Sequence, residues 1–320
     1  MKARALWAVA PGRAEIREEP LPLPAPDQAL VRTLASGVSR GTERLVLEGR
    51  VPRSQHEAMR APLMAGAFPF PVKYGYAAVG VAEDGPAALR GRRVFCLHPH
   101  QNRFAAPAAM CVPVPDAVPD RRAVLAANME TAVNVLWDAR PLVGERALVV
   151  GAGVVGLLAA ALLARVPGLD LAVCDRDPSR AGAAGALGVP FRAPEDAPDG
   201  RDLVVHASGD PAGLRLALER AGFEGRVVEA SWFGDRDAAL PLGEAFHARR
   251  LSIVSSQVGA VSPALRGRRT HAERLALALS LLEDARFDAL LGPATPFDEL
   301  PAALPALLAA GGAGCPVVTY

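Results

Sequence analysis

Three glycines and an aspartate have the residue types and the spacing that bind a dinucleotide. Gly151, Gly153 and Gly156 follow the apolar run 146–150, and Asp175 ends a second apolar run about 20 residues later. The first glycine permits a tight turn, the second lets the backbone approach a pyrophosphate, and the third lets the next helix pack close to the strand. The N-terminus of that helix favours the phosphate charge, and the acid would bond the ribose. The pattern therefore predicts strand, phosphate-binding turn, helix, strand and ribose-binding acid.

Other residues of the predicted cofactor site surround this turn. Val154 and Val155 lie inside the glycine motif, at the start of the predicted helix. Ser208, Gly209 and Gln257 follow later predicted strands, and ligands of an open parallel sheet gather at the carboxyl ends of its strands. Serine and glycine are also ordinary turn residues, so a purely structural role for these loops stays open.

The acid at the end of the second strand also bears on the choice of cofactor. Asp175 would accept hydrogen bonds from the ribose hydroxyls and repel a 2′-phosphate, so we expect NAD. The next residue, Arg176, would tolerate that phosphate if its guanidinium lay over the ribose. NADP therefore remains an alternative.

The pattern of the chain changes twice along its length, and this predicts the fold. Short β-like runs separated by proline and glycine extend to about residue 120 and indicate a mostly antiparallel, barrel-like domain. Strands then alternate with helices, which favours a parallel sheet with helices on its faces, an α/β fold of the Rossmann, doubly wound class. The elements expected from residue 123 onward are helices at 123–139, 211–221, 271–283 and near 300–310, and strands at 203–208, 226–230, 251–256 and 316–320.

Composition excludes several classes of partner. The chain has 35 basic and 34 acidic residues and a net charge of +1, so we expect that it does not bind nucleic acid. The uncharged run 147–164 approaches the roughly 20 residues of a membrane span, but its early glycines and the β-rich start favour a buried strand and turn. We therefore expect no membrane contact.

The N-terminus and the cysteines indicate the compartment. The first residues lack the long apolar core of a secretory signal, so we expect a cytoplasmic protein. The four cysteines are scattered through apolar neighbourhoods and none has CxxC spacing, which predicts reduced core thiols and excludes a cysteine-built zinc lobe. They are Cys96, Cys111, Cys174 and Cys315.

With these residues in hand, the chain resembles the medium-chain dehydrogenase/reductase superfamily, the group of alcohol dehydrogenases and quinone reductases. The likeness runs from Ala5 to about Val318, and its marks are the segments 36–43, 75–81, 144–146 and 205–209. The resemblance implies a GroES-like β-barrel catalytic domain, built from residues 1–122 and 268–320, around a Rossmann domain of residues 123–267. It also implies a small-molecule substrate bound between the domains, and a homodimer.

The chain departs from the zinc-dependent members of that superfamily. Where they carry a cysteine it has Ser39, and where they carry a Gly-His-Glu triplet it has Gly75, Tyr76 and Ala77. A hydroxyl, a phenol and a methyl do not replace the thiolate and imidazole that bind zinc. We therefore expect no zinc.

One alternative metal site stays open. Glu130 aligns with the third ligand of the sorbitol-type members, and the family plan brings His98 and His100 near the same cleft. A new zinc site built from these three side chains is the alternative to a metal-free enzyme.

Without a metal, the charge that develops on a carbonyl oxygen needs a hydrogen-bond donor or a proton source. Tyr76 is the first candidate, acidified by Lys73 or Arg40 if either lies close, although a tyrosine also simply fills a vacated pocket. The other candidate catalytic residues are His98 and His100 as a proton relay, Ser39 as a substrate-orienting hydroxyl, and Glu130.

A further acid, Glu43, lies in the same segment as Ser39. It would bind a polar group of the substrate or form an ion pair with Arg40 or Arg44, and the ion pair is the expectation.

These inferences favour a zinc-independent, NAD(P)-dependent oxidoreductase that interconverts an alcohol and a carbonyl by hydride transfer. Within the superfamily, the segments at 36–45 and 75–76 look like the zinc-free branch that includes bacteriochlorophyllide dehydrogenases. Two alternatives stay open: a quinone or enoyl type of C=C reductase, and a dinucleotide-binding protein without catalysis.

Overall fold

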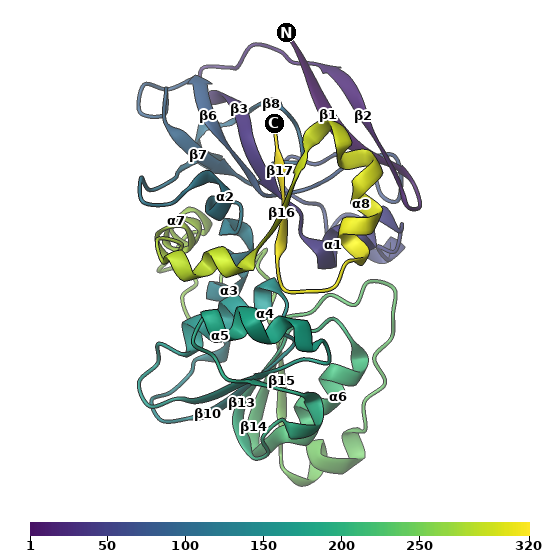
Figure 1. Ribbon diagram of the computed structural model, residues 1–320, viewed down its shortest axis with the longest axis vertical. Coiled ribbons are helices and arrows are strands. Elements are labelled where there is room, and N and C mark those ends of the chain that lie inside the picture. Colours follow the sequence, from purple (N-terminus) through teal and green to yellow (C-terminus); the bar gives the residue numbers. More distant parts are fainter.

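A six-stranded parallel sheet forms the lower half of the molecule in Figure 1. The computed structural model describes residues 1–320, and the order of this sheet is β12-β11-β10-β13-β14-β15, with every neighbouring pair parallel. Its strands are β10 (Arg146–Val150), β11 (Asp170–Cys174), β12 (Phe191–Arg192), β13 (Arg201–His206), β14 (Ala221–Glu229) and β15 (Ser252–Ser255). The predicted α/β fold with a Rossmann-type sheet is confirmed.

Helices cover both faces of this sheet because its strands are apolar on both sides. In β10, Val149 belongs to a core shared with Val133 and Leu158, whereas the adjacent Leu148 belongs to a core shared with Leu214 on the opposite face. The helical elements of this half are α3 (Ala126–Ala139), α4 (Val154–Leu163), η3 (Pro178–Arg180), α5 (Ala181–Ala186), η4 (Pro194–Asp196), α6 (Pro211–Arg220) and η5 (Leu242–Phe246). The sheet is therefore doubly wound.

Two further sheets form the other half, with strand orders β2-β1-β5-β4 and β16-β17-β3-β6-β7-β9, and β8 pairs with β3. All their pairs are antiparallel except β16 with β17. The strands are β1 (Lys2–Ala10), β2 (Arg13–Pro20), β3 (Gln28–Gly37), β4 (Ala65–Gly66), β5 (Val72–Lys73), β6 (Ala78–Asp84), β7 (Arg93–Cys96), β8 (Arg103–Pro107), β9 (Val112–Pro113), β16 (Leu291–Pro296) and β17 (Cys315–Thr319).

Both ends of the chain build this second half. Strand β17 pairs with β3, and the purple and yellow segments lie together in Figure 1. Its helical elements are α1 (Arg40–Leu47), η1 (Arg53–Gln55), η2 (Ala108–Met110), α2 (Asp120–Ala123), α7 (His271–Leu281), η6 (Ala285–Leu290), η7 (Phe297–Glu299) and α8 (Leu300–Ala309). The single helix expected at 123–139 is in fact two, α2 and α3, and the first begins one turn earlier, directly after Pro119.

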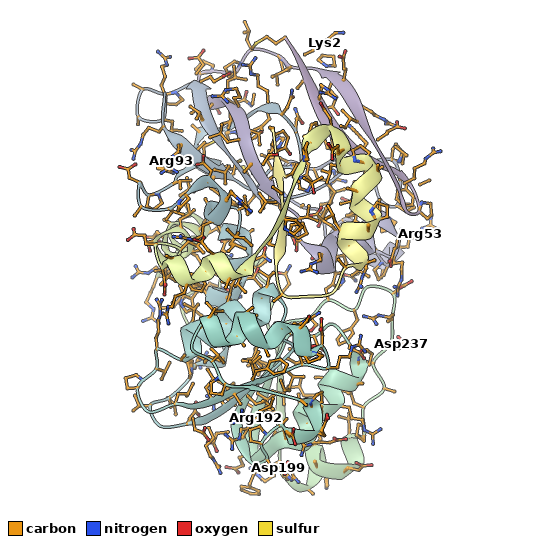
Figure 2. All side chains as sticks on the ribbon, in the orientation of Figure 1. Lys2, Arg53, Arg93, Arg192, Asp199 and Asp237 are labelled. Atoms are coloured by element: carbon orange, nitrogen blue, oxygen red, sulfur yellow. The ribbon has the colours of Figure 1, made fainter.

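Most charged side chains lie on the outside, as Lys2, Arg53 and Asp199 do in Figure 2, and a few, among them Glu43, Glu130 and Arg274, are buried. All four cysteines are buried and free, which confirms the prediction of reduced core thiols. None of the helices combines the length and the apolar character that crossing a membrane would require.

Candidate functional site

The glycine motif forms the turn between β10 and α4, and each glycine has a distinct geometric reason. Gly151 has a φ of +108°, and a Cβ there would lie 2.6 Å from the backbone nitrogen of Ser208. A Cβ on Gly156 would overlap the carbonyl oxygen of Gly151, so only glycine lets α4 approach the turn. A Cβ on Gly153 would meet nothing nearer than Arg180, at 3.8 Å, which leaves this backbone open to a ligand. The turn therefore has the shape that a pyrophosphate requires.

The N-terminus of α4 lies at this open backbone. Gly153 is its N-cap and supplies no side-chain cap, so the first backbone N–H groups, at Val154 and Val155, point toward the space above the turn. An anion there would also interact favourably with the helix dipole.

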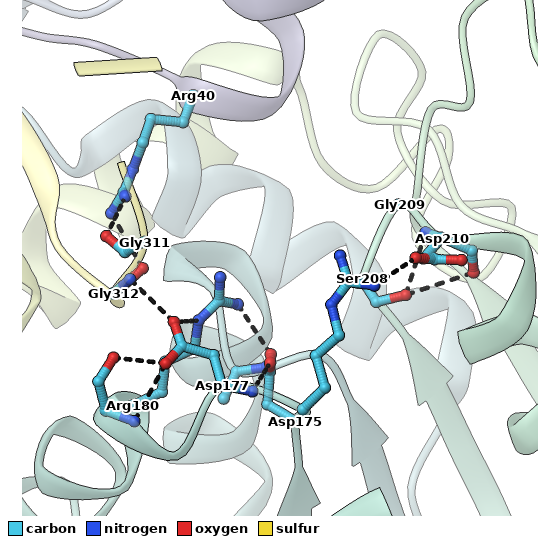
Figure 3. A network of polar contacts seen from close by, with 12 residues as sticks. Arg40, Asp175, Asp177, Arg180, Ser208, Gly209, Asp210, Gly311 and Gly312 are labelled. Carbon is cyan, nitrogen blue, oxygen red and sulfur yellow. Dashed lines mark hydrogen bonds and ion pairs between the residues drawn. The ribbon is translucent and has the colours of Figure 1, made fainter. Parts of the chain in front are cut away.

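Asp175 lies beside the turn, where the sequence predicts the ribose-binding acid. Figure 3 shows its network: the carboxylate accepts from the N–H groups of Ala152 at 2.7 Å and Asp177 at 2.9 Å and pairs with Arg180 at 2.8 Å. Its side chain is only 7% exposed. These contacts hold the acid against the glycine turn, and a ribose would share or replace the contact with Arg180.

A second acid in Figure 3 connects this corner to the other half of the molecule. Asp177 accepts from the N–H of Gly312 at 3.0 Å, and Arg180 joins it at 3.2 Å. Hydrogen bonds from Ser179, Gly312 and Arg180 hold the pKa of the Asp177 carboxyl well below its usual range. The acid is therefore charged at neutral pH, and the loop before β17 is anchored beside the predicted cofactor site.

The remaining predicted cofactor residues divide into two groups. The structure brings the loop of Ser208 and Gly209 to the glycine turn, because the Ser208 backbone packs on Gly151. The N–H of Gly209 donates to the hydroxyl of Ser231 at 3.0 Å. Arg176 is 83% exposed and pairs with Asp210 at 3.1 Å, away from the carboxylate of Asp175. Gln257 is exposed beyond β15, where its side chain accepts from the N–H of Gly259 at 2.7 Å.

In the other half, His100 is the centre of a buried hydrogen-bonded chain. Its Nε2 lies 3.0 Å from Glu43, and its Nδ1 lies 2.7 Å from the hydroxyl of Ser36, which contacts the phenol of Tyr320 at 2.9 Å. His100 is 1% exposed and Glu43 is 6% exposed. Burial raises the pKa of Tyr320, so its phenol stays protonated and completes a chain that can carry a proton.

Tyr76 and Ser39 lie beside this chain. The backbone N–H of Ser39 donates to Glu43 at 2.7 Å, and Ser39 is the N-cap of α1. Burial raises the pKa of Tyr76 to about 12, and the neighbouring hydroxyls of Ser39 and Thr42 only partly oppose it. The phenol of Tyr76 is therefore a hydrogen-bond donor at neutral pH.

The cations considered as partners of Tyr76 have other contacts. Lys73 binds Glu19 at 2.6 Å and Gln101 at 2.9 Å, and Arg40 donates to the carbonyl oxygens of residues 310, 311, 312 and 314. The ion pair expected between Glu43 and an arginine is likewise replaced, by the contact with His100.

His98 is held apart from this chain in an apolar setting. Its ring stacks on Phe104 with 3.7 Å between centroids, its Nδ1 lies 2.9 Å from the carbonyl of Pro99, and it is 5% exposed. Burial lowers the pKa of His98 to about 3, so the imidazole is neutral at physiological pH.

Glu130, on α3, forms a buried ion pair with Arg274 of α7 at 3.0 Å. Arg274 also donates to Asn134 at 2.6 Å and to the carbonyl of Ala260 at 3.2 Å. Burial raises the pKa of Glu130, and the guanidinium opposes that rise. These contacts hold Glu130 as a structural tie between two helices.

The residues present do not fit a zinc ion. Ser39, Tyr76 and Ala77 supply a hydroxyl, a phenol and a methyl. His98, His100 and Glu130 have separate partners, and the structure gathers no three His, Cys, Asp or Glu side chains that could hold a metal. The alternative site built from these three is therefore not assembled.

Two residues of the buried chain, Ser36 and Tyr320, escaped prediction as site residues, and Glu43 was expected in an ion pair with an arginine. Tyr320 meets Ser36 across 284 positions of sequence, through the pairing of β17 with β3. No local motif signals such a contact. The position of Glu43 could have been predicted, because it comes four residues after Ser39 and the first turn of a helix brings its carboxylate back to the Ser39 N–H.

No family model matches the chain. Solved structures with the same fold include L-idonate 5-dehydrogenase from Escherichia coli, with a TM-score of 0.83 and 15% identity over 100% of this chain and 99% of that one. A thermostable alcohol dehydrogenase from Pyrobaculum aerophilum has a TM-score of 0.79 and 20% identity over 100% of both chains. A short chain alcohol dehydrogenase from Escherichia coli, complexed with NADH, has a TM-score of 0.79 and 17% identity over 100% and 99%. At these identities the likeness shows the fold.

Proposed function

We propose that this chain is a zinc-independent, NAD(P)-dependent oxidoreductase that interconverts an alcohol and a carbonyl on a small or medium organic substrate. The observation that carries the proposal is the turn at Gly151, Gly153 and Gly156, open to a pyrophosphate and flanked by Asp175. The fold supports it, since solved structures that share it include an alcohol dehydrogenase and L-idonate 5-dehydrogenase.

A nicotinamide dinucleotide would supply the hydride chemistry when bound. The glycine turn and the N-terminus of α4 would hold its pyrophosphate, and Asp175 would bond its ribose. We propose NAD as the preferred form because Asp175 repels a 2′-phosphate and Arg176 lies against Asp210. The guanidinium of Arg180, which contacts Asp175, would partly offset this repulsion. We therefore expect NADP to bind as well, but more weakly than NAD.

Tyr76 is the proposed proton donor to the substrate oxygen. Its raised pKa keeps the phenol protonated, and the hydroxyls of Ser39 and Thr42 lie beside it to orient it. His100, bonded to Glu43 and Ser36, is the second proton-handling group. His98 is not assigned a role, because its neutral ring is stacked on Phe104.

The proposal includes a homodimer formed through β15. This strand is at one edge of the parallel sheet, and all four of its residues are exposed. Ile253 and Val254 keep 37% and 39% of their surface exposed. Pairing with the same strand of a second copy would cover both the apolar side chains and the free backbone groups.

The test is turnover by Tyr76→Phe, with Tyr74→Phe as a matched control whose ring lies 6.0 Å from that of Tyr76. With NADH and panels of ketones, aldehydes and enones, we expect Tyr76→Phe to bind NADH normally and lose about 10²-fold or more in kcat. Tyr74→Phe should keep its activity.

Three results would contradict the proposal: no binding of NADH or NADPH, equal kcat in Tyr76→Phe and the wild type, or one zinc ion per chain by elemental analysis. Reduction of conjugated enones without alcohol oxidation would assign the chain to the C=C reductases instead.

A further inference from the structure

A buried polar cluster lies at the carboxyl ends of β13 and β14. His206 is fully buried, its Nδ1 lies 2.6 Å from Glu229, and its Nε2 lies 2.6 Å from the hydroxyl of Ser208. Glu229 also accepts from the N–H of Ser231 at 2.6 Å. Ionisable side chains are costly to bury among apolar strands unless hydrogen-bond partners are placed well, so this cluster requires an explanation.

The cluster adjoins the point where the order of the sheet reverses. The chain runs from β10 outward to β12 on one side and from β13 outward to β15 on the other, and ligands of such sheets bind at this reversal. His206 pairs with Val150, the last residue of β10 before the glycine turn. The imidazole therefore belongs to a residue beside the end of β10, where the glycine turn of the proposed dinucleotide site begins.

The imidazole joins two loops that border this site. Through Ser208 it holds the loop that packs on Gly151, and through Glu229 it holds Ser231, whose hydroxyl accepts from the N–H of Gly209 at 3.0 Å. A Cβ on Gly213 would overlap the Ser208 hydroxyl, so α6 leaves space for the cluster. The two loops are thus joined through the histidine as well as by the direct bond between Gly209 and Ser231.

The second of these loops also reaches the other half of the molecule. Asp235 pairs with Arg50 at 2.8 Å, and Gly234 is so close to Leu45 of α1 that a Cβ would lie 2.8 Å from its Cδ2. The cluster therefore lies at the base of a segment that contacts the helix carrying Glu43.

The order of the groups, Ser208, His206 and Glu229, is also that of a serine hydrolase triad, but the surroundings do not support hydrolysis. The Ser208 hydroxyl already accepts from the N–H of Asp210 at 3.1 Å, and the Gly209 N–H is bonded to Ser231. The N–H groups of Gly209 and Asp210 are therefore already engaged and do not point to an oxyanion hole at this serine. A positioning role accounts for every contact.

We propose that His206 and Glu229 are positioning residues for the dinucleotide, holding the loops 207–210 and 230–235 in the arrangement that binds it. This inference rests on the proposed function. With its proton on Nδ1, the imidazole would donate to Glu229 and accept the Ser208 O–H at Nε2, so each polar atom would be satisfied. Loss of the imidazole would release both loops.

The test measures the dissociation constant of NADH by fluorescence, alongside KM, kcat and Tm. We expect His206→Leu with Glu229→Leu to weaken NADH binding and raise its KM by about tenfold, with kcat within about twofold of the wild type. The double variant avoids leaving Glu229 buried without a partner, which would destabilise the single variant His206→Leu. The exposed His247→Gln is the control and should match the wild type.

Conservative variants separate positioning from bulk stability. His206→Gln places an amide near the Nε2 position and keeps the Ser208 contact, whereas His206→Asn keeps only the Glu229 contact. NADH affinity should therefore be nearer to wild type in His206→Gln than in His206→Asn, whatever the Tm of each. A folded double variant with wild-type NADH affinity would overturn the inference. A wild-type chain that binds no NADH would instead overturn the proposed function on which it rests.

Discussion

At the scale of single residues, the burial of His98 predicts how the stability of the protein depends on pH. Burial lowers its pKa from the ordinary 6.5 to about 3, so between these values the unfolded chain binds more protons than the folded one. Its stabilising contribution is complete above pH 6.5 and is lost progressively as the pH falls toward 3, by at most about 1.4 kcal/mol per pH unit. Urea midpoints measured from pH 7 to pH 5 should fall more steeply in the wild type than in His98→Gln. Equal slopes would contradict this, and His247→Gln serves as the control.

The residue scale also shows where prediction from sequence succeeds. Gly151, Gly156 and Asp175 lie within one strand-turn-helix-strand unit, so the shape of the turn follows from spacing alone and the structure has it, whereas their cofactor-binding roles stay a prediction. His100 has its partners on β3 and α1, and His206 has one of its partners, Glu229, on β14, so these contacts depend on how separate elements pack. The sequence identifies His100 as a candidate but contains no signal for its partners.

At the scale of elements, Glu130 and Arg274 join α3 to α7, and they predict a large effect on stability. Glu130→Ala leaves a guanidinium that is 1% exposed without its counter-ion, so we expect the free energy of unfolding to fall by about 3 kcal/mol. Glu219→Ala removes an exposed ion pair with Arg215 on α6 and should change the free energy of unfolding by less than about 1 kcal/mol. Urea denaturation compares the two. An unchanged free energy of unfolding in Glu130→Ala would contradict the structural role.

Element positions were predicted well from local patterns, and the exceptions have a physical reason. The strands and helices around the glycine motif lie within a few residues of expectation, because apolar runs and turn residues mark them. The pairing of Glu130 with a residue 144 positions away could not be found in this way. A carboxylate in an apolar helix looks the same in sequence whether it meets a metal or an arginine.

At the scale of the whole molecule, a substitution in the exposed edge strand β15 would test the proposed dimer. Val254→Lys places a charge in the middle of that edge, so we expect sedimentation equilibrium to show a dimer for the wild type and a monomer for the variant. Leu277→Lys, at a comparably exposed apolar residue on α7, is the control and should remain a dimer. A monomeric wild type would contradict the proposal.

The pairing of β17 with β3 also governs the order in which the chain can fold as it leaves the ribosome. Strand β3 precedes the parallel sheet in the chain, but its neighbour β17 is synthesised only after that whole sheet. The parallel sheet has all its strands between Arg146 and Ser255, so it can form while the earlier strands still wait for their partner. During that interval the backbone groups at the edge of β3 that β17 will cover are unpaired, which favours pairing with other chains and aggregation.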